Sequence, residues 1–410
     1  MQSSARTDMT RSAVLTHIGG HGPTSRADLA RRLGVSPALM TQVTKDLIAD
    51  GLLSETELSP SRGGRPARLL GLVAAAGGAI GVKVVADHVT MVELGIDGSV
   101  LRSATEPFLA RSASAADDLI GLLGGFLAGA VSGRLLGIGV GAPGNVDRQA
   151  VGTVESTQLG WTHVPLGAEL RRAFDLPVLV DNNVNALAAA EILYGQARGH
   201  ADALVVTIGT GVGAAIIADG VVWRGHSGAA GEIGHIPTIE SGPLCQCGAR
   251  GCLEAVIGQD ALVAQARQRG GLTGRESIDV LRQRADAGHQ DAQDIFAQAG
   301  HRLGRAVAGL VNTLDPEVVI VSGEGVASWR HWMFGFEPAL RSGLIPSRRG
   351  VPVSVETWQD DRWAQGAACL VLATPFDQQG LSGDQGRLVR ERLAQAGPAL
   401  GQPTSAEALR

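Results

Sequence analysis

The chain has 410 residues, of which 44% are hydrophobic and 18% charged, so it can bury a sizeable core in two or three domains. The formal net charge of −5 divides into +3 over residues 1–72 and −8 over the rest, which restricts binding of nucleic acid to the N-terminal part. The longest apolar run, residues 119–133, is shorter than the roughly 20 residues that span a bilayer. Residues 1–10 contain no apolar stretch, so we expect no secretory signal. We therefore expect a buried helix at 119–133 and a cytoplasmic protein with no membrane partner.

Residues 10–58 have the pattern of helices interrupted by a glycine-rich break at 19–22. Ser25 is a favourable N-cap, and Gly34 occupies the position that commonly ends a helix. After a short turn, Ser36 can cap a second helix that has a proline at its first position, where a missing N–H is harmless. These signals predict a helix-turn-helix.

The second helix of this pair has one apolar face and one face suited to DNA. Leu39, Val43 and Leu47 lie on the apolar face. The opposite face carries small, polar and basic side chains that could enter a major groove, and arginines in the glycine-rich loop 59–68 could enter a minor groove. The predicted DNA-binding residues are Ala38, Thr41, Gln42 and Lys45 on the helix, and Arg62 and Arg65 in the loop. The alternative is a helical protein-interaction domain with a basic loop.

From about residue 72 the pattern changes to short apolar strands separated by helical runs, which is typical of α/β layers. Strands are predicted at 78–85, 89–96, 135–140, 178–180, 204–208, 214–217 and 318–322, and helices at 186–193 and 303–314. Residues 376–410 are polar and have little apolar patterning. We expect a mobile tail there, with at most an isolated helical turn or two at 388–394.

Three of the four cysteines lie within eight residues of one another, which in a reducing compartment favours a metal over disulfides. Three thiolates and one imidazole form the closed tetrahedral ligand set of structural zinc. The predicted ligands of one zinc per chain are His235, Cys245, Cys247 and Cys252. The alternative is a group of reduced core cysteines beside an unrelated histidine. Cys369 is expected to lie in the core.

The segments Gly231–His235 and Cys245–Glu254 resemble the signature of the ROK (repressor, open reading frame, kinase) family, in which Glu-x-Gly-His precedes Cys-x-Cys-Gly-x-x-Gly-Cys-x-Glu. Further segments resemble the family in the same order, at 137–144, 159–161, 178–191, 209–213 and 303–325. The resemblance implies an α/β protein with an N-terminal winged helix-turn-helix and an actin-like (ribonuclease H-like), two-lobed domain of the sugar-kinase type. The expected domains are 1–72, 73–375 with a sugar cleft between its lobes, and the tail 376–410.

The resemblance also implies a set of sugar-binding residues, at the positions where the family holds sugar hydroxyls. They are Asn182, Asn183, Glu232, His235 and Glu254. Zinc bound to one ring nitrogen of His235 would orient the ring and leave the other nitrogen for the sugar. For Glu232 and Glu254 the alternative is that they are ordinary surface charges.

Two departures from the family's kinases indicate that the chain does not transfer phosphate and is not an enzyme. Asn183 stands where a kinase has the aspartate that accepts the proton of the attacking hydroxyl, and an amide has no basic site. Lys83 replaces the aspartate of the first phosphate loop. A phosphate cradle could remain only at 209–213, but a glycine-rich turn is a weak signal by itself, and the favoured interpretation is a structural hairpin.

These observations together predict a sugar-responsive transcriptional regulator, most readily a repressor, that binds operator DNA and a monosaccharide effector. Paired recognition helices read two half-sites, so a homodimer or homotetramer is expected. Two alternatives remain open from the sequence. One is an active sugar kinase with an accessory DNA-binding domain, and the other is a DNA-binding dimer that responds to a phosphosugar or a protein partner.

Overall fold

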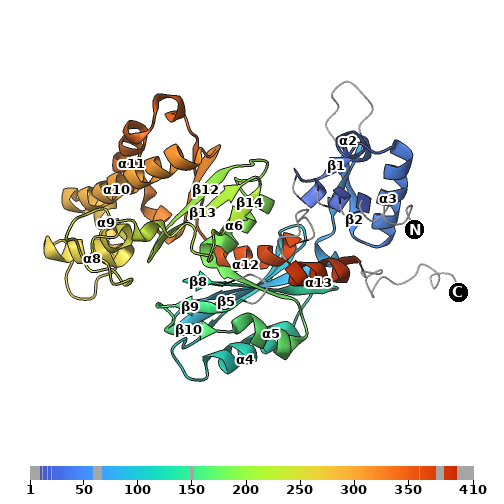
Figure 1. Ribbon diagram of the computed structural model, residues 1–410, viewed down its shortest axis with the longest axis horizontal. Coiled ribbons are helices and arrows are strands. Elements are labelled where there is room, and N and C mark those ends of the chain that lie inside the picture. Colours follow the sequence, from blue (N-terminus) through green and yellow to red (C-terminus); the bar gives the residue numbers. More distant parts are fainter. Residues whose placement is uncertain are drawn as a thin grey trace. The chain divides into compact units, whose positions relative to one another are not determined.

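The computed structural model describes residues 10–11, 13–15, 17–19, 21–58, 67–147, 152–359, 361–374 and 383–394. The chain divides into two compact units, the first built from residues 1–199 and 363–410 and the second from residues 200–362 (Figure 1). No helix within the described ranges is long and apolar enough to span a membrane.

The first unit begins with a winged helix-turn-helix, drawn in blue in Figure 1. Its elements are β1 (Thr24–Ser25), α2 (Arg26–Arg32), α3 (Pro37–Ala49), β2 (Leu53–Leu58) and β3 (Arg68–Leu72). The strands form a sheet in the order β1-β3-β2. Leu29, Met40 and Leu70 are buried, so the helices and the sheet share one core.

The predicted start and end signals of the two helices are confirmed. The hydroxyl of Ser25 accepts from the Asp28 N–H, and Gly34 has a φ of +63°. The hydroxyl of Ser36 caps α3 in the same way. The prediction of helix up to residue 58 is wrong for β2, which pairs antiparallel with β3 and supplies the base of the wing.

The remainder of the first unit is a mixed sheet of five strands in the order β11-β7-β4-β5-β6, with helices packed against it. The strands are β4 (Gly78–Val84), β5 (His88–Gly95), β6 (Val100–Pro107), β7 (Leu135–Ala142) and β11 (Val178–Asn182). A small antiparallel sheet contains β8 (Asn145–Val146), β9 (Val154–Ser156) and β10 (Trp161–Val164). The helices are α4 (Ala115–Ala128), α5 (Leu166–Phe174), α6 (Asn183–Tyr194), α12 (Arg362–Leu372) and α13 (Gly383–Ala394).

Helix α12 lies directly against the backbone of the sheet, because two glycines face it. A Cβ at Gly81 in β4 would overlap the carbonyl oxygen of Ala364, and a Cβ at Gly139 in β7 would overlap that of Ala367. The buried helix predicted at 119–133 is α4, which starts at Ala115, ends at Ala128 and buries one face only. On another edge of this unit, Nη2 of Arg198 donates to the carbonyl of Gly19 in the DNA-binding domain at 3.2 Å.

The expected mobile tail contains a packed helix, so that prediction is corrected for α13. Val389 is fully buried and Leu393 is 5% exposed. Both side chains belong to a hydrophobic core of the first unit. Nη1 of Arg134 donates to the carbonyl of Arg392, and Nε of Arg392 donates to that of Leu135 at the start of β7. The rest of the tail lies outside the described residues.

The second unit contains another five-stranded sheet, in the order β14-β13-β12-β15-β16. Its strands are β12 (Ala203–Ile208), β13 (Val212–Ala218), β14 (Val221–Trp223), β15 (Val318–Ser322) and β16 (Val353–Val355). Its helices are α7 (Leu253–Ile257), α8 (Gln259–Gln268), α9 (Ile278–Asp286), α10 (Gln290–Leu314) and α11 (Trp329–Gly343). Helices α10 and α11 pack along each other, as the orange ribbons of Figure 1 show. All seven predicted strands and both predicted helices are present in the two units.

Candidate functional sites

The predicted metal ligands come together in the second unit. His235 ends the short helix η2 (Ile233–His235). Cys245 and Cys247 lie on a tight loop closed by a bridge between Leu244 and Arg250, and Cys252 forms a bridge with Pro237. Gly251 has a φ of +73°, and a Cβ there would overlap the carbonyl of Ile239, so the loop can fold this tightly only with glycine. One ligand atom from each of the four side chains lies within 4.8 Å of the other three.

The geometry of this cluster fits zinc. Zinc–sulfur distances of about 2.3 Å and zinc–nitrogen distances of about 2.05 Å imply tetrahedral S–S and S–N separations of about 3.8 and 3.6 Å. The Sγ atoms of Cys247 and Cys252 are 3.7 Å apart, and Sγ of Cys245 is 3.5 Å from Nδ1 of His235. Burial and the neighbouring thiols raise the pKa of Cys252 to about 12, and a bound cation would supply the charge that stabilises the thiolates.

Two carboxylates, those of Glu232 and Glu254, lie close to one another near the His235 ring. Nδ1 faces the cysteines, and Nε2 is 3.7 Å from Oε2 of Glu232, which is too far for a hydrogen bond. Glu254, in the first turn of α7, accepts from the Val212 N–H at 3.0 Å. Burial raises the pKa of Glu232, His235 opposes this rise, and the charge of Glu254 adds to it. The structure thus brings Glu232, His235 and Glu254 together beside the metal ligands, an arrangement able to bind hydroxyl groups.

The other two predicted sugar ligands lie in the first unit, where β11 ends and α6 begins. Oδ1 of Asn182 caps α6 by accepting from the Val184 N–H, and Nδ2 donates to the carbonyl of Gly144, both at 2.8 Å. Oδ1 of Asn183 accepts from the same N–H at 3.1 Å. Asn182 therefore shapes this turn as well as being a candidate for sugar binding.

Two buried residues at this turn were missed by the sequence analysis. Oδ1 of Asp181 accepts from the Asn182 N–H at 2.8 Å and from Nδ2 of Asn185 at 3.0 Å, and both side chains are almost fully buried. Together they hold the first turn of α6 against the end of β11. A polar pair at positions i and i+4 beside an apolar strand and helix is the signal that could have revealed them.

The structure places Lys83 at the same sheet edge. In the strand register Lys83 pairs with Gly141 of β7, which in turn pairs with Asp181 of β11. Its ammonium lies 5.9 Å from the ring centroid of Trp363. A cation therefore stands near the candidate sugar residues of the first unit.

The glycine-rich segment 209–213 is the connection of the antiparallel hairpin β12–β13. The Gly209 N–H donates to the carbonyl of Gly211 at 3.0 Å, and the Val212 N–H donates to Glu254. These two backbone donors are occupied within the protein. The arrangement agrees with the alternative in which the segment is a structural turn.

The predicted DNA-binding residues of α3 share an exposed face. Ala38, Thr41, Gln42 and Lys45 are exposed, whereas Val43 and Leu47 on the opposite face are buried. Nε2 of Gln42 donates to Asp46 at 2.9 Å, one turn along the helix. The two predicted wing residues, Arg62 and Arg65, lie outside the described residues.

Comparisons with known proteins match both the winged helix-turn-helix and the α/β part of the chain that follows it. The ROK family matches residues 84–374 and the MarR family matches residues 7–66. The xylose repressor of Caldicellulosiruptor bescii is 28% identical over 317 residues, 73% of this chain and 79% of the relative. The DNA-binding transcriptional dual regulator NagC of Escherichia coli is 27% identical over 374 residues, 88% of this chain and 92% of the relative. A crystal structure of a ROK family transcriptional regulator, a homologue of the E. coli MLC protein, superposes with a TM-score of 0.77 at 26% identity, over 95% of this chain and 99% of that one.

A MarR-like winged helix joined to an actin-like domain of the sugar-kinase fold defines a sugar-responsive transcriptional repressor. The chain belongs to the ROK family, whose profile matches more than half of its length. The sequence-based predictions of fold, family and class of function are thereby confirmed.

Proposed function

We propose that the ROK domain of this repressor binds a monosaccharide without phosphorylating it, and that sugar binding changes the affinity for operator DNA. The observation that carries this proposal is Asn183 at the start of α6, where a kinase of the family needs a carboxylate. An amide cannot take the proton of an attacking hydroxyl. Lys83 at the same sheet edge supports the proposal, because it replaces a second acidic group.

The proposed sugar ligands are Glu232, His235 and Glu254, together with Asn182 and Asn183. Carboxylates accept from two hydroxyls at once, which suits a polyhydroxylated ring. We further propose one structural zinc per chain, bound through Nδ1 of His235 and the three clustered thiolates. That assignment is supported by the match of the S–S and S–N separations to tetrahedral zinc.

The exposed face of α3 is proposed to read operator bases, with Arg62 and Arg65 in the minor groove. Two half-sites require two recognition helices, so we propose a homodimer or homotetramer acting in the cytoplasm. The contact between Arg198 and the Gly19 carbonyl supports communication between the sugar-binding domain and the DNA-binding domain, because Arg198 closely follows the helix that Asn183 begins.

The test is titration calorimetry of the full chain against free and phosphorylated sugars, followed by operator binding with and without the best ligand. We expect a free monosaccharide to bind and to change operator affinity by about 5- to 150-fold. Sugar-dependent ADP release at about 1–100 per second with magnesium would instead identify an active kinase. If a sugar binds but operator affinity stays the same, the ROK domain would not act as a sugar sensor, and dimerisation would be its remaining role.

Glu232→Gln provides a sharper version of this test. The substitution keeps size and shape but replaces one hydroxyl acceptor by a donor, so we expect normal folding and operator binding with loss of the response to sugar. Glu317→Gln is the matched control, since Glu317 pairs with His200 elsewhere on the second unit. An unchanged sugar response in Glu232→Gln would remove Glu232 from the site.

A further inference from the structure

A charged network in the DNA-binding domain, drawn in blue in Figure 1, joins elements that the predicted recognition surface does not include. Its members are Arg26 at the start of α2, Thr44 on α3, Glu55 on β2 and Arg68 at the start of β3. Nε of Arg26 donates to Oγ1 of Thr44 at 3.0 Å, and its Nη1 donates to Oε1 of Glu55 at 2.9 Å. Nη1 of Arg68 donates to Oε2 of Glu55 at 3.0 Å. The carboxylate of Glu55 therefore holds one arginine with each of its oxygens.

Thr44 ties this network to the recognition helix. Its side chain is fully buried, and its hydroxyl donates to the Met40 carbonyl, one turn earlier in α3, at 2.8 Å. Thr44 follows Thr41 by three positions and directly precedes Lys45, and both of these neighbours are exposed on the side of α3 proposed to face DNA. The guanidinium of Arg26 is therefore fixed at the border between the buried and the DNA-facing sides of α3.

The three charged side chains are open to solvent at this border. Their exposed fractions are 31% for Arg26, 33% for Glu55 and 66% for Arg68. In helix-turn-helix complexes the first helix of the pair crosses the phosphate backbone while the second enters the major groove. Arg26 begins that first helix, and Arg68 begins the strand that follows the wing loop. Both arginines are therefore suited to bind phosphates beside the groove.

The contacts within the network leave Arg26 able to bind a phosphate as well. A guanidinium has five N–H donors in a fixed fork, and Arg26 uses one for Thr44 and one for Glu55. A carboxylate is also a direct competitor of a phosphate, because both accept parallel N–H bonds from the same fork. Glu55 thus restricts where its two arginines can reach and offsets part of their charge.

Glu55 is ionised under the conditions in which repressors bind DNA. The hydrogen bond from Arg26 is the main cause that lowers the pKa of Glu55, while desolvation acts in the opposite direction. The charges of Arg26 and Arg68 lower this pKa further. The network therefore carries one fixed negative charge between two cations.

Such a carboxylate weakens non-specific binding more than specific binding. Non-specific binding depends almost entirely on phosphate contacts, which arginines and lysines can make in many alternative arrangements. A specific complex has one arrangement, set by base contacts of the recognition helix, in which arginines that are already in place meet the phosphates. Immobilising two arginines therefore removes more contacts from the non-specific mode.

We propose that Glu55 is a specificity-determining residue, which holds Arg26 and Arg68 in the single arrangement that fits the specific site and so weakens binding to other DNA. Arg26 and Arg68 contact phosphates, and Thr44 is the positioning residue that fixes Arg26 against the recognition helix. This inference rests on the DNA-facing side proposed for α3 and is independent of the sugar and zinc sites.

The test measures fluorescence anisotropy of two labelled duplexes with the full chain over a range of salt concentrations. One duplex has random sequence, and the other is the duplex that the wild type selects from a random pool. Glu55→Gln should bind random DNA roughly 3- to 10-fold more tightly and change the selected duplex by less than about twofold. Its salt dependence on random DNA should steepen by about one unit of slope for each arginine released, an effect that a purely structural role would not produce.

Two further variants separate position from charge. Thr44→Val keeps the size and the net charge but removes the acceptor of Arg26, so it should also tighten random DNA, by roughly 2- to 5-fold. Arg26→Ala should weaken both duplexes and flatten the salt slope by about one unit, because it removes a phosphate contact. Asp50→Asn is the control, since it removes one negative charge at the other end of α3, where Asp50 pairs with Arg11 at 2.6 Å. It should leave the ratio of the two affinities within about twofold of wild type.

The proposal is overturned if Glu55→Gln leaves both the affinity for random DNA and its salt slope unchanged. It is also overturned if Asp50→Asn tightens random DNA equally, because the effect would then reflect overall charge. Circular dichroism checks the folding of each variant, and if Glu55→Gln does not fold, wild-type salt slopes in Thr44→Val and Arg26→Ala overturn the proposal. Gln42→Ala in the same assay reports separately on the proposed recognition face.

Discussion

Shortening Leu393 to alanine should destabilise the first unit by about 3 kcal/mol. The side chain is 5% exposed and packs from α13 into the core beneath the sheet. The substitution removes three carbons, worth about 2.4 kcal/mol at roughly 0.8 per buried methylene, and the remaining cavity adds to this. Because Leu393 lies in the last turn of its helix, the chain can relax around the cavity, so the loss should fall near the lower end of the 2.7–5.0 kcal/mol typical of buried leucines.

The assay is urea unfolding followed by circular dichroism, with the transition of the first unit compared between variants. Arg387→Ala is the matched control on the exposed face of the same helix, where ion pairs with Glu391 and Asp384 contribute little. We expect the control to stay within about 0.5 kcal/mol of wild type. If Leu393→Ala and Arg387→Ala unfold at the same urea concentration, α13 does not pack as described.

Three further predictions concern the metal cluster, acid stability and DNA reading. Cys247→Ser should reduce bound zinc, measured by metal analysis, from about one per chain to none and should lower the melting temperature. Cys369→Ser is the control and should keep the metal. Zinc retained in Cys247→Ser would contradict the ligand assignment. Burial by itself would raise the pKa of Glu93, but hydrogen bonds from Arg102 and from two backbone amides outweigh it and hold this pKa below 4.5. The stability that Glu93 contributes is therefore present above pH 4.5 and is lost as pH falls through its lowered folded-state pKa. Glu93→Gln should make the unfolding free energy depend less steeply on pH in the acid range. Identical slopes for the variant and the wild type would contradict this prediction. Gln42→Ala should cost roughly 1–3 kcal/mol of preference for operator over random DNA, measured by fluorescence anisotropy, and an unchanged preference would exclude Gln42 from base reading.

The sequence by itself determined the features that depend on neighbouring residues. The caps at Ser25 and Ser36 and the turn at Gly34 are fixed by hydrogen bonds and backbone angles within a few residues, so their patterns carry over directly into structure. The cysteine cluster is a further example, because the close spacing of Cys245, Cys247 and Cys252 along the chain keeps their thiols near one another.

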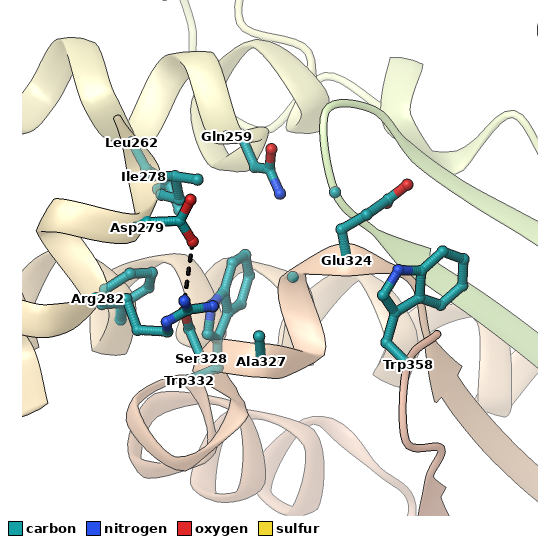
Figure 2. Close-up of a pocket in the computed structure, with 13 residues that line it drawn as sticks. Gln259, Leu262, Ile278, Asp279, Arg282, Glu324, Ala327, Ser328, Trp332 and Trp358 are labelled. Atoms are coloured by element: carbon teal, nitrogen blue, oxygen red, sulfur yellow. Dashed lines mark ion pairs between the residues drawn. The ribbon is translucent and has the colours of Figure 1, made fainter. Parts of the chain in front are cut away.

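Tertiary structure decided the features whose partners are distant in the chain. Leu53–Leu58 is a strand because it pairs with β3 across the loop, and α13 is a packed helix because Val389 and Leu393 find a core built by much earlier residues. Neither segment has enough apolar periodicity to specify this by itself. A pocket around Trp332 in the second unit (Figure 2) depends on distant residues even more strongly, because its lining extends in the sequence from Gly209 to Trp358. Only the packing of helices on the second sheet brings these side chains together.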